Sequence, residues 1–474
     1  MIFEQLPTLL IWINILIILY FLYVNGTYIT LILLSYRQVR QSRKKENLYQ
    51  LSGLFNTNLY RSATILAPAY NEELSVVAST RALLNLDYPD YEVIVVNDGS
   101  KDQTLERLIR AFRLREVDRH IPALIPSKPI RRIFGSEKYP NLLVVDKENG
   151  GKADALNAGI NVSRKDLIFS VDADSLLESD ALKKMLLAFT EDDRTIAVGG
   201  VVRVANGCTF RHGAVENVYV PGSWLTRNQA VEYLRSFLFG RIGWDYLDSL
   251  LIISGAFGVF DRQAVIDVGG YMRDTVGEDM ELVVRLHRYH LEKNIPYRIR
   301  FLPEPVCWTE IPEQIGSLAR QRNRWQRGLA DTLYRHRTML LNPKYGRLGM
   351  LAMPFFLLVE LLSPVIEIAG FLFTIVAFAS GAINWTVFLL FFAVTLLLGS
   401  LMSILSILLE ELTMKRYERI RDILTLVLYA FIENFGYRQL HLWWRFKGIV
   451  DHLRGIKKWG NMTRTATFGG KTRS

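Results

Sequence analysis

The sequence predicts an α/β fold in which a mainly parallel sheet with crossover helices is inserted between transmembrane helices. Between residues 60 and 336, short apolar runs alternate with helical patterns, which is typical of parallel strands joined by helices. Apolar stretches long enough to cross a bilayer lie on both sides of this region. With 474 residues, the chain is too long for one ordinary domain. We expect four parts: an N-terminal transmembrane anchor (1–36), a cytoplasmic domain with an interfacial helix (60–340), C-terminal transmembrane and interfacial helices (341–445), and a basic cytoplasmic tail (446–474).

The first apolar stretch, residues 9–34, contains no charged residue and is interpreted as a retained membrane anchor. It is too long for the apolar core of a signal peptide, and no small-residue cleavage site follows it. By the positive-inside rule, the basic residues that come next place the N-terminus outside and the central domain in the cytoplasm. This predicts a multi-pass protein of the cell membrane. The basic residues are Arg37, Arg40, Arg43, Lys44 and Lys45.

Four strands are predicted at residues 63–67, 91–96, 142–145 and 167–171, and polar residues follow their carboxyl ends. In open α/β sheets, ligands bind beyond the carboxyl ends of the strands, so these polar residues are candidates for a shared site. The stretch 116–139 is basic and aperiodic, and we interpret it as an excursion loop without chemistry.

A carboxylate pair, Asp172 and Asp174, stands directly after the apolar run 167–171. Two carboxylates where a strand leaves a sheet predict a hard-oxygen site for Mg²⁺ or Mn²⁺, with a diphosphate completing the coordination shell. The alternative is a solvated turn in which one Asp caps the next helix.

A second acidic pair, Glu278 and Asp279, follows Gly277 and opens a helical pattern at 280–289. The structural interpretation is a helix N-terminus with acidic side chains placed favourably for the helix dipole. The functional interpretation makes Asp279 a general base whose pKa is tuned by partial burial, by Glu278 or by the metal site.

A glycine pair and a lysine, Gly150-Gly151-Lys152, begin another predicted helix and are typical of a phosphate-binding helix N-terminus, although the Walker spacing is absent. Lys152 is equally compatible with a surface position. Asp98 follows a predicted strand, where it either accepts from a nucleobase or ribose or makes the turn that Gly99 completes.

A basic amphipathic run carries Gln321, Arg324 and Trp325, which share one face of a helix because they stand at i, i+3 and i+4. This face offers an amide, a phosphate-pairing guanidinium and a flat aromatic ring. The simpler interpretation is an interfacial helix in which Arg snorkels and Trp anchors at the lipid boundary.

The second membrane block has spanning candidates at 351–380 and 385–409. Glu360 and Glu367 lie within the first candidate, where an ionisable side chain is expected to face protein or water rather than lipid. Pairing between helices is the simpler explanation, and lining a passage for a chain is the alternative.

A third apolar stretch, residues 423–444, is ambiguous because it contains Glu433, Arg438 and His441. If it crossed the bilayer, the basic tail would lie outside, against the positive-inside rule. We therefore expect an interfacial or re-entrant helix and a cytoplasmic C-terminus.

The net charge of +10 is compatible with nucleic-acid binding, but no nucleic-acid-binding motif accompanies it. The basic residues flank membrane segments instead, so we expect them to face anionic lipid and expect no nucleic-acid partner. Cys208 and Cys307 match no zinc or redox spacing and are predicted to be reduced thiols.

Taken together in chain order, six motifs resemble those of the membrane-integrated processive glycosyltransferases of family 2. That group includes cellulose, hyaluronan, chitin and poly-β-1,6-N-acetylglucosamine synthases. The motifs are Ala67-Pro68-Ala69-Tyr70-Asn71-Glu72, Asn97-Asp98-Gly99-Ser100, Gly151 to Asn157, Asp172-Ala173-Asp174, Gly277-Glu278-Asp279 and Gln321-Arg322-Asn323-Arg324-Trp325. The resemblance implies a Rossmann-like, nucleotide-sugar-binding glycosyltransferase A-type domain between transmembrane helices.

The resemblance also implies a role for each matching residue. Pro68, Tyr70, Glu72 and Asp98 are expected to hold the uridine, and Lys152 with Asp172 to help hold the nucleotide. Asp172 and Asp174 are expected to bind Mg²⁺ or Mn²⁺, and Asp279 to act as the base beside Glu278. Gln321, Arg324 and Trp325 are expected to line the diphosphate and acceptor end, with Ser254 and Gly255 in an acceptor-side loop.

Two further features separate members of the family. Trp459-Gly460 and Thr463-Arg464 resemble an element that closes over the nucleotide in hyaluronan synthases, interrupted here by Asn461 and Met462. A cyclic-dinucleotide-binding domain of the cellulose synthase kind is not found, and the short anchor is similar to the poly-N-acetylglucosamine type. The resemblance therefore favours UDP-N-acetylglucosamine as the donor, with UDP-glucose next.

The predicted function is an inverting, processive β-glycosyltransferase that adds sugars from a UDP-sugar to a growing glycan and passes the glycan into the membrane. Its expected partners are the UDP-sugar, the glycan acceptor, the lipid bilayer and secretion proteins. One alternative is an enzyme that adds a single sugar to a membrane lipid, because glucosylceramide-type synthases carry a related motif. The other is a membrane scaffold that keeps the fold without activity.

Overall fold

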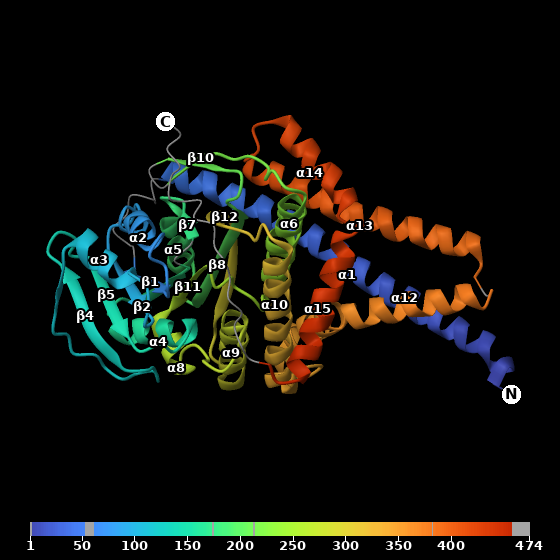
Figure 1. Ribbon diagram of the computed structural model, residues 1–474, viewed down its shortest axis with the longest axis horizontal. Helices are drawn as coiled ribbons and strands as arrows, with labels where there is room; N and C mark the ends of the chain where they lie inside the picture. Colours follow the sequence, from blue (N-terminus) through green and yellow to red (C-terminus); the bar gives the residue numbers. More distant parts are fainter. Residues whose placement is uncertain (1, 53–60, 173–174, 212–213, 382, 457–474) are drawn as a thin grey trace.

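The computed structural model describes residues 2–52, 61–172, 175–211, 214–381 and 383–456. An α/β domain forms one end of the molecule, and long helices project from its other end (Figure 1). The helices α6, α10 and α15 lie between these two parts (Figure 1). The predicted α/β fold between long apolar helices is confirmed.

The central sheet has ten strands in the order β3-β4-β5-β2-β1-β6-β11-β8-β12-β7. Its core consists of the four strands that the sequence predicts, and each is parallel to its neighbour within this group. Nearly all their residues are buried, as expected for parallel strands covered on both faces. These strands are β1 (Ala63–Ala69), β2 (Tyr91–Asn97), β5 (Leu142–Lys147) and β6 (Leu167–Val171).

Antiparallel pairs extend the sheet at both edges of this core. One edge corrects an expectation, because the stretch 116–139 is not wholly a loop: β4 pairs with β5. Alternation of apolar residues is weak in this basic strand, which hides it from pattern reading. The added strands are β3 (Leu114–Glu116), β4 (Ile130–Ser136), β7 (Ser175–Leu177), β8 (Thr195–Val204), β11 (Phe257–Asp261) and β12 (Arg298–Thr309), and β9 (Thr209–Arg211) pairs separately with β10 (Ala214–Asn217).

Alternate residues of the core strands enter two hydrophobic clusters, one on each face of the sheet. In β1, Ile65 belongs to one cluster and Leu66 to the other, and in β2 Val93 and Ile94 divide in the same way. The helices that accompany the sheet are α2 (Val76–Leu84), α3 (Thr104–Phe112), α4 (Lys152–Val162), α5 (Ala181–Glu191), α8 (Arg262–Asp267) and α9 (Glu278–Lys293).

A layer of helices lies between the sheet and the long apolar helices that project from the domain. Its central member is α10 (Ile315–Arg335), which carries the predicted motif 321–325 and packs along α15 (Tyr437–Leu453). Gly448 of α15 permits this packing, since a Cβ there would lie 2.8 Å from that of Gln326. The remaining members are α6 (Trp224–Leu234), η2 (Arg235–Gly240), α7 (Arg241–Tyr246), η3 (Arg337–Met339) and η4 (Pro343–Tyr345).

Two helices of the described residues are long and apolar enough to cross a membrane, at Trp12–Ser42 and Trp385–Leu412. A third span is formed if Leu348–Leu361 and Ser363–Ala379 act together across their 47° bend. Pro364 in the first turn of the second half accounts for the break, because proline lacks the donor that would continue the helix. These segments are α1 (Ile2–Ser52), η5 (Leu348–Ala352), α11 (Met353–Phe355), η6 (Phe356–Leu361), α12 (Ser363–Ala379) and α13 (Trp385–Met414).

Two expected boundaries are not breaks in the structure, and one stretch expected as a single helix is broken. The first helix continues beyond residue 36, to Ser52, and the boundary at 445/446 falls inside α15. The ambiguous stretch 423–444 is two helices, α14 (Ile420–Ile432) and α15, separated at Gly436 with φ of +86°. Glycine adopts this left-handed conformation without the steric cost that other residues incur, so it separates the two helices.

Candidate active site

One cavity of about 2390 Å³ begins at the carboxyl ends of the core strands and continues between α1, α12 and α13. It is larger than the roughly 300–1,000 Å³ of ordinary small-molecule pockets. Every site residue expected from the sequence lines it, apart from Asp174, which lies outside the described residues. These lining residues are Pro68, Tyr70, Glu72, Asp98, Lys152, Asp172, Ser254, Gly255, Glu278, Asp279, Gln321, Arg324 and Trp325.

The strand order places the mouth of this cavity at a topological switch point. The chain runs from β1 outward through β2 to β5 and then returns to the other side of β1 as β6. At such a point the loops after neighbouring strands diverge and leave a crevice for a ligand. Pro68 and Tyr70 enter it from the end of β1, and Asp172 enters from the end of β6.

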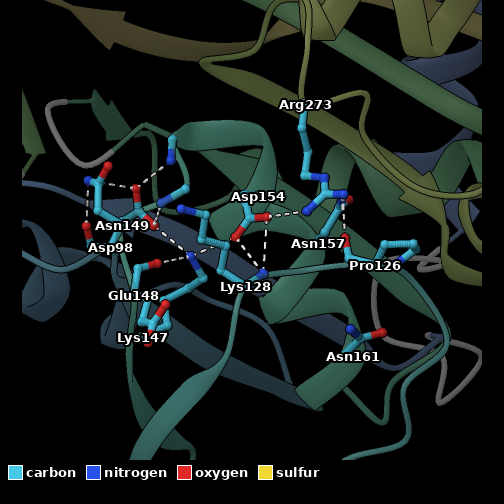
Figure 2. A network of polar contacts seen from close by, with 12 residues as sticks. Asp98, Pro126, Lys128, Lys147, Glu148, Asn149, Asp154, Asn157, Asn161 and Arg273 are labelled. Carbon is cyan, nitrogen blue, oxygen red and sulfur yellow. Dashed lines mark hydrogen bonds and ion pairs between the residues drawn. The ribbon is translucent and has the colours of Figure 1, made fainter.

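Asp98 is almost fully buried, and its carboxylate accepts four hydrogen bonds, which Figure 2 shows in part. Its Oδ1 accepts from Lys147 Nζ at 2.7 Å and from the Gly150 amide at 3.0 Å. Its Oδ2 accepts from the Gly151 amide at 2.7 Å and from Asn149 Nδ2 at 3.2 Å. A carboxylate has about four lone-pair sites, so Asp98 holds the glycine turn in this arrangement. Direct contact between Asp98 and a nucleoside stays a prediction.

Lys147 links this turn to α4, the helix that follows the turn. Lys147 was not identified from the sequence, because it ends an apolar strand, as a surface lysine often does. Its ammonium is fully buried and lies 2.7 Å from both Asp98 and Asp154 (Figure 2). Asp154 also accepts from the Lys128 amide and from Arg273, which stands in the loop before α9. Burial raises the pKa of Asp154, but the hydrogen bond from Lys147 and the others reverse this and hold it below its usual value.

We expect Lys147→Met to weaken both stability and nucleotide binding. The change leaves two buried carboxylates without their shared cation, a loss worth about 3–5 kcal/mol. It also removes the cation that holds Asp98 in place, and Asp98 holds the Gly150-Gly151 turn. Arg273→Met is the matched control, because it removes a half-exposed partner of Asp154 and should cost at most about 1 kcal/mol. Thermal unfolding and UDP calorimetry on both variants measure the difference, and equal losses would contradict the role of Lys147.

Lys152 lies at the centre of the candidate site, at the first position of α4 after Gly151. Gly151 has φ of +89°, a left-handed value that only glycine adopts easily. The Lys152 ammonium contacts Asp172 Oδ1 and donates to the Gly255 carbonyl at 3.1 Å. Burial lowers the pKa of Lys152, but Asp172 and Glu278 raise it above its ordinary value, so the side chain stays cationic.

Asp172 is a cavity-lining carboxylate, the donor type that Mg²⁺ and Mn²⁺ prefer. Among the described residues, no group of three or more His, Cys, Asp or Glu is arranged to hold a metal ion. A metal at Asp172 would therefore need oxygen ligands from a bound diphosphate, and its predicted partner Asp174 is not among the described residues.

Asp279 stands in the first turn of α9, where the helix dipole favours its negative charge. Its Oδ2 accepts from the Gly255 amide at 3.1 Å, and its Oδ1 from the Met280 amide at 2.9 Å. Burial and the neighbouring Asp279 carboxylate raise the pKa of Glu278, and Lys152 and Arg324 oppose that rise without cancelling it. The structure thus brings the loop at Gly255, Lys152 and both acids together.

The start of α9 packs in close backbone contact with α10, the helix that carries the motif 321–325. A Cβ on Gly277 would lie 2.8 Å from the Gly328 Cα, and a Cβ on Gly328 would lie 2.9 Å from the Gly277 Cα. Backbone cannot yield at these distances, so the two glycines set the separation between Asp279 and α10. The sequence alone shows the glycines but not that they meet.

Arg322 is a buried residue of the same motif to which the sequence assigns no role beside Gln321 and Trp325. It is 1% exposed, and its guanidinium lies 4.2 Å from the centre of the Trp325 ring, within cation–π range. It also donates to Gln321 Oε1 at 2.8 Å. One buried cation therefore fixes both of the predicted acceptor-binding side chains.

The partner of Arg322 is Glu232 of α6, at 2.8 Å. Tyr437 of α15 donates to the same carboxylate at 2.5 Å, and His441 lies 3.5 Å from it. Burial raises the pKa of Glu232, but the guanidinium of Arg322 with its neighbours reverses this and lowers the pKa to about 2. The part of the cavity predicted to hold the acceptor is thus held by three helices, α6, α10 and α15.

A sheet with this switch point, leading into a cavity lined by acids and basic side chains, is compatible with a glycosyltransferase A-type domain. Two family profiles match the chain: glycosyl transferase family 2 over residues 64–121 and glycosyl transferase family group 2 over residues 167–409. The chain belongs to glycosyl transferase family group 2.

Among its curated relatives are poly-beta-1,6-N-acetyl-D-glucosamine synthases of two staphylococci. The protein of Staphylococcus aureus (strain COL) is 29% identical over 303 residues, which are 63% of this chain and 60% of the relative. That of Staphylococcus epidermidis (strain ATCC 35984) is 29% identical over 273 residues, 57% of this chain and 55% of the relative. The matched region thus spans less than two thirds of these relatives.

A similar solved structure is the mannosyltransferase PcManGT from Pyrobaculum calidifontis, in complex with GDP-Man and Mn2+. It superposes with a TM-score of 0.50 at 17% sequence identity, covering 86% of this chain and 99% of that protein. At this identity the likeness concerns the fold.

Proposed function

We propose that this protein is an inverting, processive β-glycosyltransferase that extends a glycan from a UDP-sugar and passes it into the membrane. The observation that carries the proposal is the single cavity that joins the nucleotide end, the acidic pair and the membrane helices. A product leaving the reaction centre along it enters the membrane part without crossing bulk solvent.

In this proposal, Asp279 takes the proton from the acceptor hydroxyl, which attacks the anomeric carbon in line with the departing diphosphate. Lys152 and Arg324 are cations close to the neighbouring acid Glu278, and in this proposal they stabilise the charge that develops on the leaving UDP. Direct displacement needs no covalent intermediate and inverts the anomeric centre. The Gly255 amide holds the Asp279 carboxylate toward the acceptor-side loop.

A divalent cation, Mg²⁺ or Mn²⁺, fits at Asp172 when a nucleoside diphosphate supplies the other oxygen ligands, and it would neutralise charge on the leaving group. The structure of the Pyrobaculum mannosyltransferase in complex with GDP-Man and Mn2+ supports this assignment. Asp174 is the second proposed ligand.

For the transferred sugar, we propose N-acetylglucosamine, with glucose as the second candidate. The staphylococcal relatives, named as poly-N-acetylglucosamine synthases, support the first choice. Tyr70, Pro68 and Glu72 line the nucleotide end of the cavity and are proposed to hold the uridine. Gln321, Trp325 and the loop at Ser254 are proposed to hold the acceptor.

We propose three membrane spans, made by α1, the bent pair before residue 380, and α13. With the N-terminus outside, three spans place the catalytic domain and the C-terminus in the cytoplasm, as the charge pattern predicts. The helices α14 and α15 then lie at the cytoplasmic surface. The proposed location is the cell membrane, and a secreted glycan implies secretion partners. The tail element at residues 459–464 lies outside the described residues, and its gating role stays a prediction.

Incubation of the purified protein in proteoliposomes with a panel of radiolabelled UDP-sugars tests the proposal. We expect Mg²⁺- or Mn²⁺-dependent UDP release with one N-acetylhexosamine or hexose donor, and a ladder or high polymer as product. One added sugar on a lipid would instead support the single-addition alternative. Absence of both UDP binding and turnover would contradict the proposed activity.

A further inference from the structure

The two groups proposed to act on the leaving diphosphate and on the acceptor hydroxyl both stand at the start of a helix. Lys152 is the first residue of α4, and Asp279 is the second residue of α9. A displacement between reacting groups is costly in rate, so the reaction depends on how α4 is placed relative to α9. The contacts that join these two helices are therefore candidates for a role in catalysis.

Asn157 of α4 joins its helix to the loop that leads into α9. Its side-chain amide pairs with the backbone of one residue: Nδ2 donates to the Tyr271 carbonyl at 2.8 Å, and Oδ1 accepts from the Tyr271 amide at 2.7 Å. A longer contact runs from Nδ2 to the Pro126 carbonyl at 3.5 Å (Figure 2). Asn157 is 1% exposed, so these hydrogen bonds are shielded from water. An amide that matches both backbone groups of Tyr271 fixes that residue in distance and in orientation.

The loop after α8 has a backbone that permits this contact. Gly269 and Gly270 have φ of +83° and +76°, left-handed values that other residues adopt only at a cost. A Cβ on Gly270 would also lie 2.6 Å from Asn157 Oδ1, so a larger residue would separate the loop from α4. Arg285 of α9 donates to the Gly270 carbonyl at 2.6 Å. The loop is thus held by α4 and by α9 together.

The side chain of Tyr271 extends this contact toward the reaction centre. Tyr271 is buried, and its burial raises the pKa of the phenol above its usual range. The acids Asp279, Glu278 and Asp172 raise that pKa further, so the ring lies within electrostatic reach of all three. A shift of the Tyr271 backbone would therefore change the surroundings of these acids.

From these contacts we propose that Asn157 is a positioning residue that holds the loop before α9 so that Asp279 keeps its working distance from Lys152. The inference rests on the proposed function, in which Asp279 is the base and Lys152 assists the departure of UDP. Asn157 is not among the residues that line the cavity, so it acts on the reaction through Tyr271. The Gly150-Gly151 turn is tied to α4 by other contacts, so loss of Asn157 should lower the rate more than nucleotide binding.

The same face of α4 offers a matched control. Asn161, one turn farther along, is 4% exposed and pairs in the same way with the backbone of Ile125. Its Nδ2 donates to the Ile125 carbonyl at 2.8 Å, and its Oδ1 accepts from the Ile125 amide at 3.0 Å. Ile125 lies between β3 and β4, in a stretch that leads to no proposed catalytic residue. Leucine at position 157 or 161 is close in size to asparagine and leaves the same two backbone groups without their side-chain partner.

Turnover and thermal unfolding of full-length Asn157→Leu and Asn161→Leu in proteoliposomes, with the best donor of the UDP-sugar panel, test the inference. We expect similar falls in melting temperature, because equivalent buried hydrogen bonds are lost. For Asn157→Leu, kcat should fall about 10²-fold while KM for the UDP-sugar stays within about twofold. For Asn161→Leu, kcat should stay within about twofold of the wild type. Equal kcat in the two leucine variants would overturn the inference alone, whereas a wild type that releases no UDP would overturn the proposed function first.

Asn157→Asp is a second test that does not depend on the folding of the leucine variant. A protonated Asp has the shape of Asn and both donates and accepts, so it reproduces both hydrogen bonds to Tyr271, whereas the carboxylate cannot donate. Burial and the nearby Asp154 favour the protonated form, and Lys147 and Arg273, the partners of Asp154, oppose this only in part. The kcat of the variant relative to the wild type should therefore fall about tenfold or more from about pH 6 to about pH 9. A ratio that is constant over this range would contradict the positioning role.

Discussion

Asp279→Asn should abolish sugar transfer while UDP still binds. The amide keeps the shape of the carboxylate and can still accept from the Gly255 amide, but it cannot take a proton from an acceptor hydroxyl. General-base catalysis contributes about 10²–10⁴-fold to rate, so we expect a loss of at least that size in turnover. Release of UDP from the cognate UDP-sugar measures the rate, and calorimetry measures UDP affinity.

The neighbouring acid provides the comparison for this result. Glu278 is buried with a raised pKa, so its carboxyl is closer to the neutral form that glutamine imitates. Glu278→Gln should therefore lose less activity than Asp279→Asn. Turnover of Asp279→Asn at the wild-type rate, or loss of UDP binding together with activity, would show that the base assignment is wrong.

The parallel core of the fold could be predicted because each of its strands is a short, nearly continuous apolar run. The same reasoning failed for β4, whose sequence Ile130–Ser136 contains Arg131 and Arg132 and has no clear period of two. It also failed for the bend between η6 and α12, since Pro364 sits at a position where a membrane helix often tolerates proline. Pairing with β5 decides the first case, and the missing backbone donor of Pro364 decides the second.

The candidate site could be predicted where its residues form local motifs at the ends of elements. Lys152, Asp172 and Asp279 were found in this way, and the fold brings them to one cavity. Lys147 and Glu232 could not be found, because their importance comes from partners far away in the chain. Glu232 meets Arg322 across 90 positions, and no spacing rule reaches that distance.

Arg322→Met should be the most destabilising change in the acceptor end of the site. Removing the guanidinium leaves Glu232 as a buried carboxylate that has lost its main partner, which costs about 3–5 kcal/mol. Trp325 and Gln321 lose the cation that fixes them, so acceptor binding should weaken as well. Thermal unfolding measures the first effect. A rise in the apparent KM for the acceptor, larger than the fall in kcat, measures the second.

The pH dependence of the stability of Arg322→Met distinguishes loss of the ion pair with Glu232 from simple loss of packing. In the wild type the pKa of Glu232 is lowered to about 2, so the pair stabilises the fold above the ordinary glutamate pKa and loses its effect only as pH falls toward 2. Without Arg322, burial raises that pKa, and the cost of ionising Glu232 is greatest at neutral pH. The stability deficit of Arg322→Met should therefore shrink between pH 8 and about pH 5, where carboxyl groups begin to protonate.

Glu232→Gln in the same background should remove most of the deficit at neutral pH, because no buried charge is then left. A deficit that is constant with pH and unchanged by the second substitution would mean that Arg322 acts through packing alone.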